Sequence, residues 1–258
     1  MVDKIKNRLT QSALLFILLF CGTAMSAKIN ILTEHLAPFQ IVEGNKIGGL
    51  STEIVEATLK EARLTYNIEA YPWSLSYHSA LQKKNTCIYS LARLPQRQNL
   101  FHWIGHITTS TISLYALKNK TLKIDNLTQA KNYKIAVIKD DVTHHFLLSK
   151  GFVENKNLYV MNNYDSLLKL LEIPSRQIDF VVINDDLINN RVKNTAKASK
   201  YQAVFLFKEL TLDFYFACSL TTDKALVASL TQAMAKLEKQ GAYAAIKKRW
   251  QRNMVNII

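Results

Sequence analysis

Acidic side chains follow several short apolar segments of the sequence, where a folded chain could use them to bind a positively charged group. The segments are KINILT at 28–33, YKIAVI at 133–138 and IDFVVI at 178–183. The acids that come after them are Glu34, Asp140, Asp141 and Asp185. Carboxylates attract ammonium and guanidinium groups, although a carboxylate can equally cap a helix, as Asp141 would. The pattern therefore predicts that these positions attract a positively charged group.

Histidines and nucleophiles give weaker signals. His102 and His106 are four residues apart, which would place both on one helical face, but FHWIGHI contains Gly105 and is typical of an extended chain. His144 and His145 are adjacent and need not face one site, and no cysteine or carboxylate cluster completes a metal set. No Gly-rich phosphate loop, GxSxG or Cys–His pattern is present. We expect no metal, no cofactor and no nucleophilic catalysis.

The composition limits which architecture can position these residues. The chain has 258 residues, of which 48% are hydrophobic and 21% charged. That is enough apolar content for one large domain or two lobes, and too much for a disordered chain. The formal net charge is +13, which favours acidic partners without naming one. No zinc-finger spacing, basic helix or RNA-binding signature accompanies it, so we expect no nucleic-acid partner.

The N-terminus predicts export. Basic residues precede the apolar run ALLFILLF at 13–20, and small residues follow it. This is the layout of a signal peptide, which we assign to residues 1–27; a retained anchor is disfavoured because a spanning helix needs about 20 apolar residues. The mature protein should be soluble and periplasmic. Its cysteines would be Cys87 and Cys218, and the oxidising compartment would allow them to pair if they lie within reach of each other.

Two similar units follow one another along the chain. Apolar segments alternate with helical patterns over 28–91 and again over 133–183, in the order βαβαβ each time. This order predicts parallel sheets with helices packed on them, an α/β fold. We expect Ser51 to cap the first helix, and a final helix from about Thr222 to Lys239.

Two extended apolar stretches flank the second unit, ISLYAL at 112–117 and FYFACS at 214–219. They predict two lobes joined by two hinge crossings. Lobe 1 would contain residues 28–117 and 206–258, and lobe 2 would contain residues 118–205. A cleft between two α/β lobes is a common ligand site, because the carboxyl ends of the strands point into it.

Four short motifs stand in a recognisable order: TEHLAPF at 33–39, GGLSTEI at 48–54, ARLPQR at 92–97 followed by FHW, and YAAIKKRW at 243–250. In this order and spacing, behind a signal peptide, they resemble the bacterial extracellular solute-binding proteins of family 3. These are the polar amino-acid type of periplasmic binding protein, with the class II two-lobed fold. The resemblance covers nearly all of residues 28–252.

The resemblance implies a role for Arg97. In the family, the arginine at this place binds the carboxylate of the ligand, and a planar guanidinium suits that task because it makes two parallel hydrogen bonds. Ser90 matches a family position that supplies a hydroxyl near the ligand. The next two hydroxyl positions are Ala92 and Leu94 here. These departures remove donors from the carboxylate site and weigh against a standard amino acid.

Aromatic residues are implied as well. Trp73 and Tyr77 stand where the family places an aromatic ring against the ligand side chain. Such a ring can also hold a cation, and core packing is an equally good interpretation.

In lobe 2 the departures from the family are larger. Asp140, Asp141 and Thr143 stand where the family has a Gly-Thr-Thr-like turn. The family's acidic ligand for the amino group falls on Asn184, or on Asp185 if the alignment slips by one residue. We expect these acids to make lobe 2 attractive to an ammonium or guanidinium group.

The implied function is binding rather than catalysis: the capture of a small polar solute, an amino acid or a related basic or zwitterionic metabolite, by hinge closure. The ligand would then be presented to an ABC-type permease or to a membrane sensor. We expect a monomer without enzymatic activity. The alternative is a periplasmic lyase of the cyclohexadienyl dehydratase kind on the same fold, with Glu34 or Asp141 as the acid.

Overall fold

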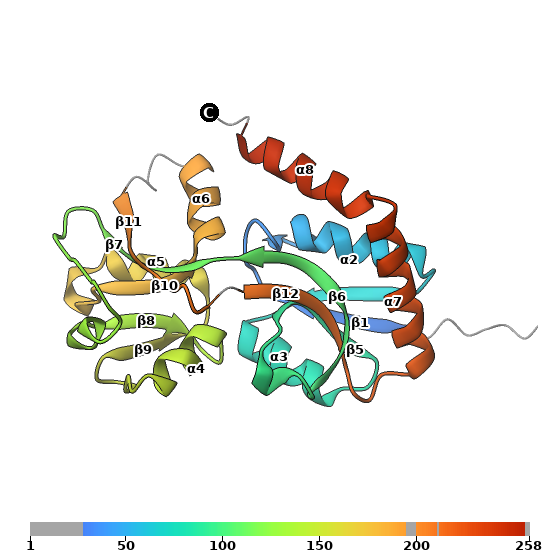
Figure 1. Ribbon diagram of the computed structural model, residues 1–258, viewed down its shortest axis with the longest axis horizontal. Helices are drawn as coiled ribbons and strands as arrows, with labels where there is room; N and C mark the ends of the chain where they lie inside the picture. The colour runs from blue at the N-terminus through green and yellow to red at the C-terminus, as the bar shows by residue number, and fades with distance from the viewer. Residues whose placement is uncertain (1–27, 195–199, 211, 256–258) are drawn as a thin grey trace, which may run out of the picture.

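Two lobes lie side by side in the molecule (Figure 1). The structure, a computed structural model, describes residues 28–194, 200–210 and 212–255. The signal peptide expected at 1–27 lies outside the described residues. Each lobe contains one five-stranded sheet with helices packed on it, which confirms the α/β fold expected from the alternating pattern. Within the described ranges, no helix is both long enough and apolar enough to cross a membrane.

Five strands form the sheet of lobe 1: β1 (Ile29–Thr33), β4 (Tyr66–Ala70), β5 (Thr86–Ala92), β6 (Phe101–Ser110) and β12 (Leu212–Ser219). Their order is β4-β1-β5-β12-β6. β1 is parallel to β4 and β5, whereas β12 is antiparallel to β5 and β6. Every residue of β5 is buried, as expected for a central strand with helices on both faces of its sheet.

Helices cover both faces of this sheet. They are α2 (Leu50–Glu61), α3 (Trp73–Gln82), α7 (Lys224–Lys239) and α8 (Ala242–Val255). α2, α7 and α8 pack against one another on one face, and α3 lies on the other (Figure 1). The helix expected from about Thr222 to Lys239 is present as α7, but its N-cap is Asp223 and not Thr222, and it is not the final helix because α8 follows it. The Asp223 carboxylate accepts a hydrogen bond from the N–H of Ala225 at 2.7 Å, which is the usual bond of such a cap.

The start of α2 differs from the prediction. A two-stranded hairpin, β2 (Ile41–Glu43) and β3 (Lys46–Gly48), leads into this helix. The helix has Gly49 as its N-cap, so that Ser51 lies inside the first turn. Gly49 has a φ of 108°, and a Cβ there would lie 2.4 Å from the carbonyl oxygen of Phe39. The helix starts where the chain can pass this close to another backbone, and only glycine permits that approach.

Five strands form the sheet of lobe 2: β7 (Ile112–Leu117), β8 (Ile135–Ile138), β9 (Leu158–Met161), β10 (Phe180–Asn184) and β11 (Tyr201–Leu206). Their order, β11-β7-β10-β8-β9, repeats that of lobe 1. In both sheets the first strand of the unit lies between the second and the third, and the strand beyond the third is antiparallel. The two βαβαβ units therefore fold alike. The helices of lobe 2 are α4 (Val142–Ser149), α5 (Tyr164–Leu171) and α6 (Asp185–Asn194), with short turns η2 (Gln129–Asn132) and η3 (Pro174–Arg176).

The chain passes between the sheets twice. The first crossing is at Thr111, between β6 and β7, and the second lies between the end of β11 at Leu206 and the start of β12 at Leu212. β7 pairs with β10 and β11, so residues 112–117, which the sequence analysis placed in lobe 1, belong to the sheet of lobe 2. The apolar pattern of this stretch predicts a strand but does not show which sheet the strand joins.

Cys87 of β5 and Cys218 of β12 form a disulfide bond. They are cross-strand partners with Cα atoms 3.8 Å apart, and both are completely buried. The bond joins positions that are 131 residues apart in sequence, within lobe 1. The pairing that the sequence left open is thus explained by the neighbouring places of β5 and β12 in one sheet.

Candidate functional site

A buried arginine lies just after the carboxyl end of β5. Arg97 ends the short turn η1 (Pro95–Arg97), and only 3% of its surface is exposed. Its Nη2 donates to the carbonyl oxygen of Asp140 at 3.3 Å, whereas Nη1 has no hydrogen-bond partner among the described residues. Its guanidinium carbon lies 4.8 Å from the ring centre of Tyr77 and 5.7 Å from that of Trp73. A buried cation with an unused donor is suited to an anionic group of a ligand.

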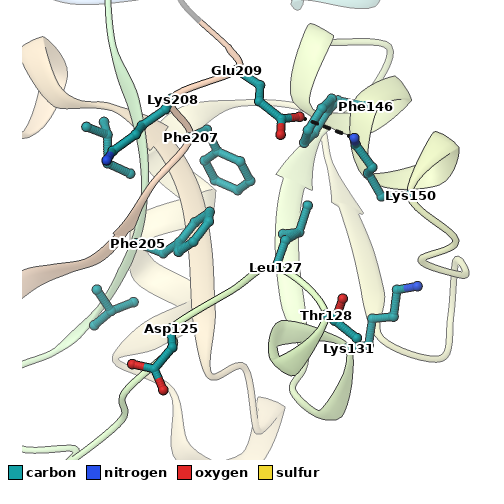
Figure 2. Close-up of a pocket in the computed structure, with 12 residues that line it drawn as sticks. Asp125, Leu127, Thr128, Lys131, Phe146, Lys150, Phe205, Phe207, Lys208 and Glu209 are labelled. Atoms are coloured by element: carbon teal, nitrogen blue, oxygen red, sulfur yellow. Dashed lines mark ion pairs between the residues drawn. The ribbon is translucent and has the colours of Figure 1, made fainter.

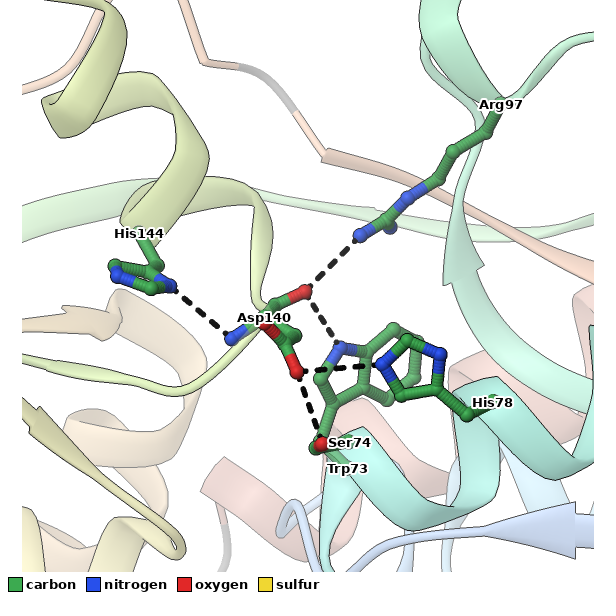
Figure 3. Close-up of polar contacts among 6 residues, drawn as sticks. All are labelled: Trp73, Ser74, His78, Arg97, Asp140 and His144. Carbon is green, nitrogen blue, oxygen red and sulfur yellow. Dashed lines mark hydrogen bonds and ion pairs between the residues drawn. The ribbon is translucent and has the colours of Figure 1, made fainter.

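Asp140 of lobe 2 contacts lobe 1 at several points (Figure 3). Its carbonyl oxygen accepts from the guanidinium described above and from Trp73 Nε1 at 3.1 Å. Its carboxylate accepts from Ser74 Oγ at 2.9 Å and lies 3.4 Å from His78 Nε2. Its backbone N–H donates to Nδ1 of His144 at 3.2 Å. The His144 contact lies within lobe 2, whereas the contacts with Trp73, Ser74, His78 and Arg97 hold the two lobes together on one side of the site.

The pKa of Asp140 reflects those contacts. Burial acts to raise it, but the hydrogen bond from Ser74 and the nearby His78 together outweigh burial, so the pKa lies below its ordinary value. Asp140 also has a φ of 57°, a conformation that few non-glycine residues adopt. The aspartate is therefore kept ionised in a backbone conformation that directs its carbonyl oxygen to lobe 1.

Two acids from opposite lobes line one cavity with the arginine. Glu34 follows β1 and is 8% exposed, and Asp141 is the N-cap of α4. Asp141 accepts hydrogen bonds from Thr143 Oγ1 and from the hydroxyl of Tyr164, each at 3.3 Å. Burial raises the pKa of both carboxyls, and the charge of Asp141 raises that of Glu34 further. A cation between them would favour their ionised forms.

The cavity is small and lies between the lobes. Lobe 1 contributes Glu34, Trp73, Ser90 and Arg97, and lobe 2 contributes Asp141 and Tyr164. The Ser90 hydroxyl is buried and, within the described ranges, has no hydrogen-bond partner. The volume is about 10 Å³, close to that of a single water site. Among the described residues, Arg97 Nη1 and the Ser90 hydroxyl are hydrogen-bond donors without a partner, and the carboxyls of Glu34 and Asp141 line the same cavity. This arrangement suits a ligand that carries both a negative and a positive charge.

Most of the predicted site residues come together here. Five of them line the cavity, namely Glu34, Trp73, Ser90, Arg97 and Asp141. Three more predicted residues contact the residues that line the cavity. The Tyr77 ring lies against Arg97, the Asp140 carbonyl oxygen accepts from the Arg97 guanidinium, and Thr143 donates to Asp141.

Asn184 and Asp185 lie elsewhere, at the first crossing. Asn184 Nδ2 donates to Ser110 Oγ at 3.2 Å, and Asp185 accepts from the hydroxyls of Tyr115, at 2.7 Å, and Thr111. They are found there because β10 pairs with β7, the strand that the chain enters at the crossing. In this arrangement both residues hold the crossing instead of lining the cavity.

Sequence reasoning missed Tyr164. It is the first residue of α5, directly after the N-cap Asn163, whose side chain accepts from the N–H of Ser166 at 2.8 Å. Burial and the charge of Asp141 raise the pKa of the Tyr164 hydroxyl well above its usual range. A signal was available, because α5 starts after the parallel strand β9, and such helix starts face the cleft.

A larger cavity, of about 650 Å³, lies on lobe 2 (Figure 2). Its walls include the rings of Phe146, Phe205 and Phe207, and an ion pair between Lys150 and Glu209, at 3.2 Å, crosses its edge. It shares no lining residue with the cavity between the lobes. Its lining comes from lobe 2 and from the crossing after β11 and includes five charged side chains, so this cavity is separate from the site between the lobes.

Metal ligands are not gathered in the part of the chain that the structure describes, where no group of three or more His, Cys, Asp or Glu side chains could hold a metal ion. His102 and His106 lie on the extended strand β6. His144 Nε2 lies 2.9 Å from a carboxylate oxygen of Glu154.

Solved structures share this architecture. A histidine kinase sensor domain with similarity to periplasmic binding proteins has 18% identity and a TM-score of 0.75, with 87% of this chain and 96% of that chain covered. The arginine-, lysine-, histidine-binding protein ArtJ of Geobacillus stearothermophilus has 19% identity and a TM-score of 0.72, with 86% and 94% covered. AbpA of Streptococcus pneumoniae, an amino acid ABC transporter substrate-binding protein bound to L-arginine, has 17% identity and a TM-score of 0.71, with 86% and 93% covered. At these identities the likeness establishes the fold.

Sequence comparison identifies the family. No curated protein sequence was found to match this chain. The family described as bacterial extracellular solute-binding proteins, family 3, matches residues 29–253, which span both sheets and every residue of the cavity. The chain therefore belongs to family 3 of the bacterial extracellular solute-binding proteins.

Proposed function

We propose that this solute-binding protein holds a basic or zwitterionic solute, such as an α-amino acid, between its lobes and does not change it chemically. The observation that carries the proposal is the buried guanidinium of Arg97. Its Nη1 has no hydrogen-bond partner among the residues that the structure describes, and Arg97 lines a cavity to which both lobes contribute. A solute that contacts both lobes stabilises the closed state more than the open one, which is what closure by a ligand requires.

The charges around the cavity support this class of ligand. Arg97 supplies a positive charge for a carboxylate, and Glu34 and Asp141 supply two carboxyls for a cation. A ligand with a second carboxylate would add negative charge beside these acids, which already have raised pKa values. ArtJ is named for binding arginine, lysine and histidine, and AbpA was solved bound to L-arginine, which agrees with the proposal.

Delivery of the solute is the second part of the proposal. We propose that the protein is exported by its N-terminal signal peptide, acts as a monomer in the periplasm and presents the solute to an ABC-type permease. A membrane sensor is the alternative partner, since one of the similar structures is the sensor domain of a histidine kinase.

Calorimetric titration with lysine, arginine, glutamate and aspartate tests the ligand class. We expect lysine and arginine to bind, and Arg97→Ala to weaken their binding by about 10- to 100-fold, because hydrogen bonds to a charged group contribute about 1.5–3 kcal/mol. Arg93→Ala is the matched control: this guanidinium is exposed and lies over the rings of Trp103 and Tyr215. Binding of the acidic pair alone would refute the ligand class, and unchanged affinity in the Arg97 variant would refute the site.

Incubation with prephenate or arogenate tests the lyase alternative with the same samples. We expect both compounds to be recovered unchanged after prolonged incubation. Formation of a product that is lost in a Glu34→Gln variant would replace the binding function by a catalytic one.

A further inference from the structure

The cavity on lobe 2 lies against the second crossing of the chain. Three residues that line it, Phe207, Lys208 and Glu209, belong to the segment between β11 and β12. The backbone N–H of Phe207 donates to the carbonyl oxygen of Ile112, the first residue after the other crossing, at 3.0 Å. One wall of this cavity is therefore formed where the two crossings lie side by side.

The middle of the cavity wall is apolar. The rings of Phe146 and Phe205 pack edge-to-face against that of Phe207, with ring centres 6.0 and 5.4 Å apart. In Figure 2, Phe205, Phe207 and Leu127 occupy the middle of the lining, and charged side chains surround them. Leu206, which also lines the cavity, is 44% exposed. The volume of about 650 Å³ is within the range of small-molecule sites, and the apolar body of a ligand would shield this surface from water.

The charges around this apolar surface favour an anion. The lining contains three lysines, Lys131, Lys150 and Lys208, against two acids, Asp125 and Glu209. The ion pair at 3.2 Å between Lys150 and Glu209 uses one charge of each sign. In the part of the chain that the structure describes, no carboxylate lies within ion-pair distance of Lys131 or Lys208. These two lysines outnumber the remaining acid, so the lining attracts a negatively charged group.

We propose that this cavity is a second binding site of the protein, separate from the solute site, and that it takes a small amphipathic anion. An aromatic or aliphatic body would lie over Phe205 and Phe207, and one anionic group would be directed to Lys131 and Lys208. The sign of its charge distinguishes this ligand from the basic or zwitterionic solute between the lobes. The bound molecule would contact the chain where it passes from one lobe to the other.

Fluorescence titration of the full mature chain with two probes tests the site. The probes are anilinonaphthalene sulfonate, an aromatic monoanion, and phenylnaphthylamine, which has the same rings without the sulfonate. We expect the sulfonate to bind one molecule per chain. Thr128→Trp puts a large ring into the cavity from an exposed position and should abolish binding of both probes. Thr121→Trp, at an exposed threonine of lobe 2 outside the lining, is the matched control and should bind both as the wild type does.

Two pairs of lysines test the charge. The variant Lys131→Gln, Lys208→Gln should weaken binding of the sulfonate by about two- to tenfold, the range of one or two exposed ion pairs, and leave phenylnaphthylamine unchanged. The control Lys123→Gln, Lys156→Gln removes the same charge from exposed residues of lobe 2 that do not line the cavity, and it should keep wild-type binding.

Four outcomes would overturn the second site and leave the proposed solute binding untouched. They are no binding of the sulfonate to the wild type, binding that survives in Thr128→Trp, equal weakening by both lysine pairs, and equal weakening of both probes in the variant of Lys131 and Lys208.

Discussion

Two arginines of one motif show that burial decides which side chain becomes a binding group. Arg93 and Arg97 are four residues apart, and both lie over aromatic rings. Arg93 is exposed and its Nε donates to Gln98 at 3.0 Å, so its charge is also solvated by water. Arg97 is turned inward by η1, and its Nη1 has no hydrogen-bond partner within the described part of the chain. An incoming carboxylate stabilises Arg97 more than Arg93, because a buried hydrogen-bond donor without a partner has lost its contact with water.

Replacing Glu34 with Gln should make folding stability less dependent on pH. Burial, reinforced by Asp141, raises the pKa of Glu34 above 4.5, so between 4.5 and the raised pKa the folded state binds more protons than the unfolded state. The free energy of unfolding of the wild type therefore falls as pH rises through this window, by about 1.4 kcal/mol for each pKa unit. Urea unfolding from pH 4 to 8 should show a smaller fall in Glu34→Gln. The control Glu43→Gln alters an exposed carboxyl of the β2–β3 hairpin and should keep the wild-type slope; the same slope in both variants would contradict the explanation.

At the scale of elements, the site is assembled from segments that follow parallel strands. Glu34 follows β1, Arg97 follows β5, Asp141 follows β8, and Tyr164 follows β9 by way of Asn163. All four segments line one cavity, so the carboxyl ends of the parallel strands of both lobes face the space between the lobes. The position of these segments therefore depends on where each helix begins.

Gly49→Ala should destabilise lobe 1, because a Cβ at this N-cap of α2 would lie 2.4 Å from the Phe39 carbonyl oxygen and because φ is 108°. We expect a loss of about 2–4 kcal/mol in the free energy of unfolding, the range for strained backbone plus a steric clash. Gly48→Ala is the matched control, since a Cβ there would meet nothing within 4 Å. Chemical unfolding of the two variants should give clearly different midpoints, and similar midpoints would show that the contact with Phe39 can relax.

The sequence shows which residues of a segment are apolar or polar more reliably than it shows which strand that segment pairs with. The two βαβαβ units and the acids after their strands follow from hydrophobic patterns, and most of the expected site residues lie in or beside the cavity. The membership of β7 in lobe 2 does not follow from the hydrophobic pattern, because an apolar strand can pair in either sheet. The place of Asp185 also depends on strand pairing. Counting along the chain puts Asp185 directly after β10, where a ligand was expected, but the pairing of β10 with β7 brings it to the crossing at Thr111.

At the scale of the whole molecule, contacts within the protein contribute to lobe closure. Asp140 of lobe 2 is bound by Trp73, Ser74 and Arg97 of lobe 1, and His78 lies beside its carboxylate. These contacts have to break when the lobes separate. The equilibrium between open and closed molecules therefore depends on them as well as on the solute.

The double substitution Ser74→Ala, His78→Ala should shift the molecule toward its open form. It removes both side chains that contact the Asp140 carboxylate and leaves the cavity residues in place. Small-angle scattering of the protein without added solute should give a larger radius of gyration than for the wild type. Ser79→Ala, Gln82→Ala on the same helix should scatter as the wild type does. If the double variant and wild type have the same scattering profile, these contacts do not contribute to closure.

The Cys87–Cys218 bond closes a ring of chain that contains all of lobe 2, because β5 and β12 stand before and after that lobe in the sequence. A protease that cuts one peptide bond anywhere from 88 to 217 would therefore leave both fragments covalently attached. Such a nicked protein would migrate as one band on a denaturing gel and separate into two bands once a thiol reductant is added. In a compartment rich in proteases, the ring would keep a damaged copy of the solute-binding protein in one piece.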